Sequence, residues 1–384
     1  MSRSRSTLLP VSLLLALSVL AFFATGCRRL AAPPEKVYVC VRRTYLRDRV
    51  AAVSNRTAEV LNGQTLTVLE HGRRFLRVRT PDGKTGWIED HLVIDQKTYD
   101  AFQKLATDNR NDPVTATAVL DDQLYMHVSP GRDTDHFYLL PANSKVTLLI
   151  RASVPKSGQA PASLARLAEA APQGASAKGQ ASGPQQPPPP PMEDWWLARD
   201  AKGNTGWMLA SRLYIDVPDA IAEYGEGQDF VGAWKIATIN DPQSDAPNHE
   251  VPEYLTVMAP PQSGLPFDFN QVRIFTWSRN HHRYETGFRL HPIQGFLPVK
   301  IFTAPGPKGS EVPAFSFLLG YNDNVKVDPE TGVARPVNPR TIEYELIDTQ
   351  VKRIGPDMAP IEIRHEGEKR AAKKLHHPAR HKRR

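Results

Sequence analysis

The chain has 384 residues, with 48 Lys and Arg against 41 Asp and Glu, which gives a formal net charge of +7. It contains only two cysteines, and this excludes a disulfide-dense scaffold. The length allows two or three domains, and the 34 prolines are concentrated between apolar stretches, as expected for modules joined by linkers.

The first residues have the pattern of an export signal. Arg3 and Arg5 are followed by an almost wholly apolar run over residues 8–24, and small residues then lead to Cys27. A basic start, an apolar middle and a small-residue cleavage site are typical of a secretory signal, which does not belong to the mature fold. No other stretch of the chain is apolar enough to span a membrane.

Ala24-Thr25-Gly26-Cys27 resembles the bacterial lipobox. The resemblance implies that residues 1–26 are removed and that acyl chains on Cys27 hold the protein on a membrane, with residues 27–35 as a tether. An ordinary cleaved signal without a lipid is the alternative. We expect a lipid-anchored protein of the cell envelope that faces the periplasm or the cell exterior. Cys40 then has no partner for a disulfide.

An internal repeat organises residues 36–216. At an offset of 80, Tyr45-Leu46-Arg47 matches Tyr125-Met126-His127, and at an offset of 120, Gly86-Trp87-Ile88 matches Gly206-Trp207-Met208. The change of offset means that the second copy carries an insert of about forty residues, which we place at 151–193. Its Ala- and Pro-rich sequence lacks the aromatic and β-branched residues of a core, so we expect a solvated loop.

Each copy consists of short alternating stretches separated by turn residues, a pattern that predicts a small β barrel. Gly86-Trp87-Ile88 with Val93, and Gly206-Trp207-Met208 with Leu213, resemble the closing strand of the bacterial SH3 family. The resemblance covers residues 36–95 and 116–216. It implies binding of peptidoglycan or of a protein partner rather than catalysis.

The resemblance makes the aromatic residues of the two copies candidate ligand contacts: Tyr45, Phe75, Trp87, Tyr125, Trp195, Trp196 and Trp207. A small barrel also needs aromatic residues in its core, and we expect Trp87 and Trp207 to lie there. Adjacent residues of a strand face opposite ways, so one of Trp195 and Trp196 should be buried and the other exposed. The exposed one is the better candidate contact.

The rest of the chain predicts a third β unit. Residues 96–115 should form a helical linker, and residues 217–228 a second linker. Residues 229–350 contain seven strand-like stretches between turn formers, which predicts an antiparallel barrel or sandwich. The predicted strands are 231–239, 254–258, 272–277, 284–290, 296–302, 313–318 and 341–347. The expected fold class is therefore all-β.

No catalytic or metal site is recognisable, so we expect neither an enzyme nor a cofactor. His281 and His282 precede Glu285, but neighbours on a strand point to opposite faces and cannot easily share one ion. A cysteine nucleophile needs a histidine base, yet Cys27 lies in the signal and Cys40 in a predicted strand. The sequence also lacks a glycine-rich phosphate loop and a serine elbow.

Residues 351–384 form a predicted basic tail. From Arg364 to Arg384 there are nine Lys and Arg and four His, against two Glu. Such a segment predicts attraction to anionic lipid headgroups or wall polymers, and nucleic acid is not expected as a partner of an exported protein. A merely solubilising tail is the alternative.

These features favour a non-catalytic, membrane-anchored envelope protein whose SH3-like modules bind peptidoglycan or a protein partner. The alternative is an adaptor or assembly lipoprotein of a larger envelope complex. In that case the SH3-like copies only space the C-terminal domain from the membrane.

Overall fold

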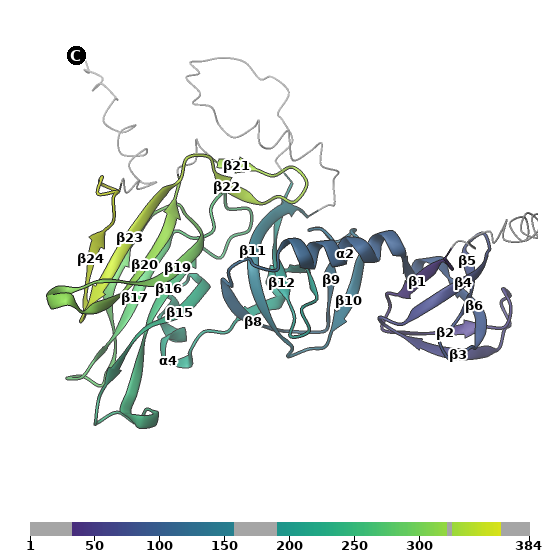
Figure 1. Ribbon diagram of the computed structural model, residues 1–384, viewed down its shortest axis with the longest axis horizontal. Helices are drawn as coiled ribbons and strands as arrows, with labels where there is room; N and C mark the ends of the chain where they lie inside the picture. The colour runs from purple at the N-terminus through teal and green to yellow at the C-terminus, as the bar shows by residue number, and fades with distance from the viewer. Residues whose placement is uncertain (1–32, 157–189, 321–324, 362–384) are drawn as a thin grey trace, which may run out of the picture.

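A computed structural model of the protein describes residues 33–156, 190–320 and 325–361. Three β units follow one another along the long axis, as Figure 1 shows. We call them module 1 (residues 36–95), module 2 (residues 116–216) and the C-terminal domain (residues 217–361). Strands dominate all three units, so the predicted all-β class is confirmed.

Three predicted features lie outside the described residues: the signal at 1–26, the lipid-bearing Cys27 and the basic segment 364–384. Among the residues that the structure does describe, no helix combines the length and the apolar character needed to cross a membrane.

Modules 1 and 2 share one sheet topology. Module 1 consists of β1 Lys36–Val39, β2 Arg43–Arg47, β3 Arg56–Leu61, β4 Thr65–His71, β5 Phe75–Arg79, β6 Thr85–Glu89, η1 Asp90–Leu92 and β7 Val93–Asp95. Module 2 consists of β8 Ala116–Leu120, β9 Leu124–His127, β10 His136–Leu140, β11 Lys145–Pro155, β12 Met192–Arg199, β13 Thr205–Leu209, η2 Ala210–Arg212 and β14 Leu213–Ile215. The strand orders are β3-β2-β6-β5-β4-β1-β7 and β10-β9-β13-β12-β11-β8-β14, which are the same order in the two copies. The two predicted SH3-like barrels are therefore present.

The glycine before each repeated tryptophan allows two strands to cross. A Cβ on Gly86 would lie 2.7 Å from the Cβ of Leu46 on β2, and a Cβ on Gly206 would lie 2.6 Å from the Cβ of Met126 on β9. Carbon atoms cannot approach so closely, so glycine is required where another strand comes near. Two positions after Gly86, Ile88 points into the apolar core of module 1.

Helix α2, Gln96–Asp108, joins the two modules at the place where a linker helix was predicted. The Asp95 side chain accepts a hydrogen bond from Thr98 N at 2.7 Å and so caps the first turn. Phe102, at the centre of the helix, is completely buried. The helix therefore packs into the structure and does not act as a free hinge.

Modules 1 and 2 also contact each other directly. The Tyr38 ring of module 1 stacks on Tyr99 of α2 with 4.0 Å between ring centroids. Asn62 of module 1 donates from Nδ2 to the Phe137 carbonyl of module 2 at 2.8 Å, and its Oδ1 accepts from Leu139 N at 3.3 Å. These contacts fix the orientation of the two barrels.

Strands β11 and β12 extend beyond the barrel as a two-stranded arm. Their pairing continues to Pro155 opposite Met192, and Lys156 N donates to the Pro191 carbonyl at 2.8 Å. The prediction that residues 151–193 form a solvated loop was therefore wrong at both ends, because these ends are paired and partly buried strand. Residues 157–189 lie outside the described part of the chain.

The arm joins module 2 to the C-terminal domain. In that domain the short strands β21 Val325–Val327 and β22 Ala334–Pro336 form a hairpin, which lies beside the arm in Figure 1. Ser153 N on the arm donates to the Gly332 carbonyl of this hairpin at 3.1 Å. Val154 and Val333 belong to one buried apolar cluster. Sequence periodicity gave no sign of this long-range contact.

The C-terminal domain is a sandwich of two four-stranded antiparallel sheets. One sheet has the order β15-β16-β17-β18, with β15 Asp229–Asn240, β16 Glu250–Ala259, β17 Gln271–Ser278 and β18 Arg283–Leu290. The other has the order β19-β20-β23-β24, with β19 Gly295–Pro305, β20 Glu311–Leu319, β23 Arg340–Ile347 and β24 Gln350–Ile354. The 3-10 turns are η4 Pro247–His249 and η5 Pro307–Gly309. Leu255, Ile274, Phe315 and Ile342 are fully buried in the shared core. All seven predicted strands are present, in a sandwich rather than a barrel.

Two predicted boundaries of this domain were wrong. The expected linker at 217–228 contains helix α4 Asp219–Ala222 and the turn η3 Glu223–Gly225, and Ile221 is fully buried. The sheet also includes the beginning of the predicted tail, because β24 ends at Ile354. Both errors have one cause: short segments with little periodicity are held by contacts with distant strands.

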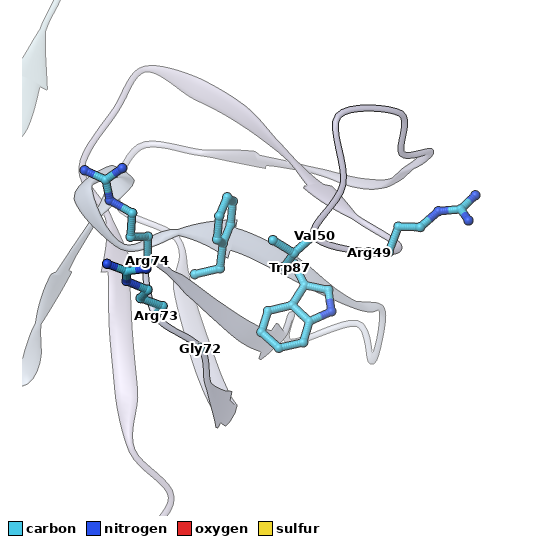
Figure 2. A pocket seen from close by; sticks show the side chains of 7 residues that line it. Arg49, Val50, Gly72, Arg73, Arg74 and Trp87 are labelled. Carbon is cyan, nitrogen blue, oxygen red and sulfur yellow. The ribbon is translucent and has the colours of Figure 1, made fainter.

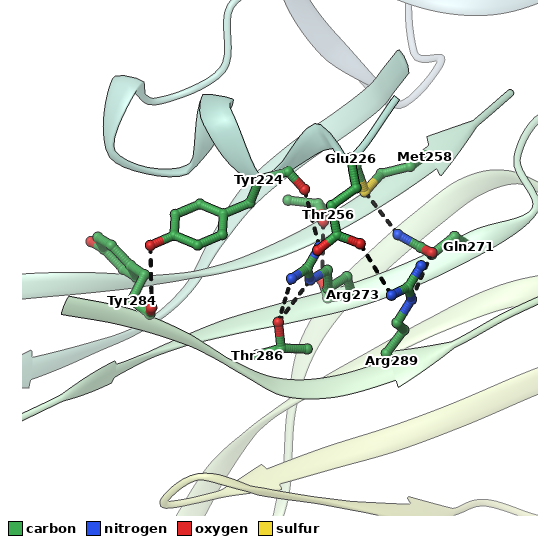
Figure 3. Close-up of polar contacts among 9 residues, drawn as sticks. All are labelled: Tyr224, Glu226, Thr256, Met258, Gln271, Arg273, Tyr284, Thr286 and Arg289. Carbon is green, nitrogen blue, oxygen red and sulfur yellow. Dashed lines mark hydrogen bonds and ion pairs between the residues drawn. The ribbon is translucent and has the colours of Figure 1, made fainter. Parts of the chain in front are cut away.

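A polar cluster attaches η3 to the first sheet of the sandwich (Figure 3). Arg273 on β17 donates to Glu226 at 3.0 Å and to the Tyr224 carbonyl at 3.0 Å, and Arg289 on β18 donates to the other Glu226 oxygen at 3.1 Å. The hydroxyl of Thr286 also accepts from Arg273. Because this cluster satisfies its charges internally, we assign it a structural role.

Candidate functional site

An open groove lies on the outer face of module 1, between the β2–β3 loop and the β4–β5 turn. It has a volume of about 460 Å³, and Figure 2 shows the side chains that line it. Phe75 from β5 and Trp87 from β6 line the groove, and both are half-buried. Val50 from the β2–β3 loop adds an apolar side chain that is 49% exposed. The groove therefore presents an apolar, aromatic surface to solvent.

Arginine side chains stand at both ends of this groove. Figure 2 shows Arg73 and Arg74 at one end and Arg49 at the other, with Trp87 between them. In the described chain, the guanidinium groups of Arg73 and Arg74 have no hydrogen-bond or ion-pair partner. Arg49 lies 3.6 Å from Asp48, an exposed pair that contributes little to stability. These cations are therefore available to a ligand.

Strand alternation explains why Phe75 and Trp87 face outwards. Leu76 and Ile88, their neighbours, are buried in the core of module 1. The residues on either side of them must then point to the opposite face. The prediction that Trp87 belongs to the barrel core was therefore wrong, because Ile88 occupies the inward position of β6.

The corresponding tryptophans of module 2 are covered. Trp195 and Trp196 are 2% and 5% exposed, so the prediction that one of them is exposed was wrong. Trp196 points into the barrel core, whereas Trp195 belongs to a separate buried cluster outside it. Trp207 is buried as expected, but in the outer cluster rather than in the core. Leu105 of α2 and Val333 of the C-terminal domain pack in this cluster and remove the outer face from solvent.

The two candidate tyrosines lie outside the groove. Tyr45 on β2 is covered by Arg56, whose guanidinium carbon lies 4.1 Å from the ring centroid. Tyr125 on β9 packs beside His136 with 4.4 Å between ring centroids. Of the seven predicted contact residues, the structure brings only Phe75 and Trp87 together in an open site.

Sequence reasoning missed the arginines of the groove. Arg73 and Arg74 directly precede Phe75, and Arg49 follows the repeated Tyr45-Leu46-Arg47 element. An arginine pair next to an aromatic residue at the tip of a predicted hairpin was a usable signal. The position of Arg49 at the other end of the same groove could not be predicted, because it depends on how β2 pairs with β6.

Histidine side chains of the C-terminal domain are engaged separately. His281 Nδ1 lies 2.7 Å from Glu285 Oε1, and His282 Nδ1 lies 3.1 Å from Asp241 Oδ2. The two rings thus contact different carboxylates. Among the described residues, no group of three or more His, Cys, Asp or Glu could hold a metal ion.

Comparisons with known proteins give one family match. Residues 43–94 match the family model of the bacterial SH3 domain. No curated protein sequence matches the chain.

Similar solved structures include NlpC2 and NlpC1 from Trichomonas vaginalis and an NlpC/P60 family protein from Bacillus cereus. NlpC2 is 9% identical, with 66% of this chain and 92% of that chain covered and a TM-score of 0.15. The Bacillus cereus protein is 10% identical, with coverages of 79% and 94% and a TM-score of 0.21.

In module 1 the strand order and the Gly-Trp-aliphatic closing strand agree with the family match. Residues 43–94 of the chain are a bacterial SH3 domain.

Proposed function

We propose that the protein is a non-catalytic, membrane-anchored protein of the cell envelope that binds peptidoglycan through the groove of module 1. The observation that carries this proposal is the open pair Phe75 and Trp87, which module 1 leaves half-exposed while module 2 covers its equivalents. Exposed aromatic residues in a groove are typical anchors for an extended ligand. Bacterial SH3 domains commonly occur in proteins associated with the cell wall, which supports this choice of ligand.

The membrane anchor is the second part of the proposal, and it rests on the run from Arg3 to Cys27. Intact mass of the membrane-extracted protein should show loss of residues 1–26 and the added mass of a lipid. Cys27→Ala should release the protein from the membrane or block its processing. A soluble protein of unmodified mass would contradict the anchor. The basic segment 364–384 would add attraction to anionic surfaces.

One observation favours a second candidate function. Module 2 is covered by α2 on one side and by the C-terminal domain on another. A module without an open groove suits a spacer, as in an adaptor lipoprotein that presents its C-terminal domain to a larger envelope complex. In that case module 1 would also be dispensable for binding to the wall.

The test of the proposed function is binding of the full-length mature protein to purified sacculi. Trp87→Ala should weaken binding by about 2 kcal/mol, roughly 30-fold, which is the usual cost of truncating a central aromatic anchor. Tyr214→Ala is the matched control, because Tyr214 is an aromatic residue of module 2 that is 63% exposed and does not line the groove. Equal binding by both variants, or no binding by the wild type, would favour the spacer function. Circular dichroism checks that both variants are folded.

A further inference from the structure

The structure contains an internal ion pair at the place in module 2 that corresponds to the groove of module 1. Arg132 lies on the loop between β9 and β10, and Glu193 lies on β12, two residues before Trp195. Arg132 Nε lies 3.0 Å and 2.9 Å from the two Glu193 oxygens, and Nη2 lies 2.6 Å from Oε1. This two-point contact joins the two sides of the outer face, and a guanidinium recognises a carboxylate best in this geometry.

In module 1 the two equivalent segments, the β2–β3 loop and the residues just before Phe75, both carry arginines. The β2–β3 loop contributes Arg49, and the two residues before Phe75 are Arg73 and Arg74. In module 2, the two residues before Trp195 are the acidic Glu193 and Asp194. The charge at this position is therefore reversed between the copies. Where module 2 places the carboxylates of Glu193 and Asp194, module 1 has Arg73 and Arg74, whose guanidinium groups lack a partner in the described chain.

We propose that the groove of module 1 binds a peptide that carries free carboxylates, and that Arg73 and Arg74 select this ligand. A carboxylate of the peptide would be bound by Arg73 and Arg74 at one end of the groove, while Arg49 stands at the other end, where a second carboxylate could reach it. The backbone and side chains of the peptide would lie over Phe75 and Trp87. The inference rests on the proposed function and specifies the ligand chemistry of the same groove.

The geometry of module 2 also explains why only one copy takes this ligand. Its equivalent tryptophan, Trp207, is 3% exposed. Its counterpart of Arg47 is His127, and burial lowers the pKa of this imidazole to about 4, so the ring is neutral at neutral pH. Asp194 is bound by Arg151 at 2.7 Å. The described residues of module 2 therefore offer neither an open aromatic surface nor a free cation at this place.

The test uses the full-length mature protein and the double variant Arg73→Glu, Arg74→Glu. Both residues are exposed in a turn, so the substitutions should not affect folding. The matched control is Arg79→Glu, Lys84→Glu, which makes the same charge change at the opposite end of the β5–β6 hairpin. The first probe is an N-acetylated, C-terminally amidated pentaglutamate peptide, with pentaglutamine as the neutral counterpart.

The wild type and the control should bind pentaglutamate and not pentaglutamine. The Arg73/Arg74 variant should bind pentaglutamate at least about tenfold more weakly, since charge-assisted contacts are replaced by repulsion. Equal binding of pentaglutamate by this variant and the control would overturn the inference. The peptide experiment does not use peptidoglycan, so its result separates the carboxylate inference from the proposed function.

The second probe is purified sacculi in three forms: untreated, with carboxyl groups amidated, and with phosphate polymers removed by hydrofluoric acid. Amidation should reduce wild-type binding about tenfold, whereas removal of phosphate should leave it unchanged. Loss of binding after phosphate removal alone would overturn the choice of a carboxylate ligand. If pentaglutamate binds as expected but no form of sacculi does, the carboxylate site stands and the proposed function fails.

Discussion

Arg151 and Asp268 face each other across the contact between module 2 and the C-terminal domain, with Nη1 and Oδ1 3.9 Å apart. Arg151 also holds Asp194 at 2.7 Å and the Phe267 carbonyl at 2.8 Å, and its side chain is only 9% exposed. A single guanidinium thus contacts two carboxylates, that of the buried Asp268 and that of the half-buried Asp194. Burial is the main reason why the pKa of Asp268 rises to about 6, even though Arg151 opposes this change.

The first prediction concerns this buried arginine. Arg151→Met should lower the free energy of unfolding by about 3–5 kcal/mol, because the buried Asp268 and the half-buried Asp194 lose their compensating charge. The control is Arg212→Met, which removes an exposed arginine 3.7 Å from Asp121 and should cost less than about 1 kcal/mol. Urea denaturation of both variants measures the difference. Similar losses in the two variants would show that the buried cluster does not hold the domains together.

The second prediction concerns pH. Glu253 on β16 is 1% exposed, and burial raises its pKa from 4.5 to about 7. Its carboxylate accepts a hydrogen bond from Trp277 N at 3.2 Å. A group whose pKa is higher in the folded state stabilises the fold when protonated, so this contribution is full below about pH 4.5 and is lost as the pH rises through 7.

Glu253→Gln keeps an acceptor for Trp277 N and removes the titration. We expect the variant to be more stable than the wild type at pH 8, by up to about 3 kcal/mol, with the difference disappearing near pH 4.5. Glu250→Gln, at an exposed position of the same strand, is the control. Unfolding measured from pH 4.5 to 8 gives the comparison, and parallel curves for wild type and Glu253→Gln would contradict the prediction.

The third prediction tests the crossing glycines. Gly86→Ala and Gly206→Ala should each cost about 1–3 kcal/mol, because the new Cβ would overlap the Cβ of Leu46 or Met126. Thermal unfolding of each variant measures this cost. A variant as stable as the wild type would show that β2 or β9 can move away from the closing strand at no cost.

The sequence was sufficient to predict the elements whose signals are local. The repeated Gly86-Trp87-Ile88 and Gly206-Trp207-Met208 predicted two equivalent barrels, and alternating apolar residues located the seven main strands of the sandwich. These signals come from contacts within a strand or between neighbouring strands, where periodicity determines the buried face.

The errors arose where a distant segment covers a surface. Trp195 faces outwards from its barrel, as alternation requires, but α2 and the β21–β22 hairpin bury it. Trp87 has the same orientation in module 1 and remains open, because no described segment packs there. The repeated Thr-Gly-Trp motif is the same in both copies, so strand alternation alone does not distinguish the two environments. The open site could therefore be located only after the three units were placed relative to one another.

The last prediction separates the arm from the residues beyond its tip. Lys156 N and the Pro191 carbonyl are 2.8 Å apart, so a two-residue turn can connect the strands at this point. Replacing residues 157–190 by Asn-Gly, a sequence that favours a tight hairpin turn, should leave module 2 folded. Shortening the loop should raise the free energy of unfolding by no more than about 2.5 kcal/mol, at about 0.6 kcal/mol per halving of length. The longer deletion of 151–193 should instead be strongly destabilising, because it removes Arg151 and the strand paired with Trp195. Urea denaturation of both deletions provides the test, and equal losses of stability would show that the residues beyond the tip contribute as much as the arm.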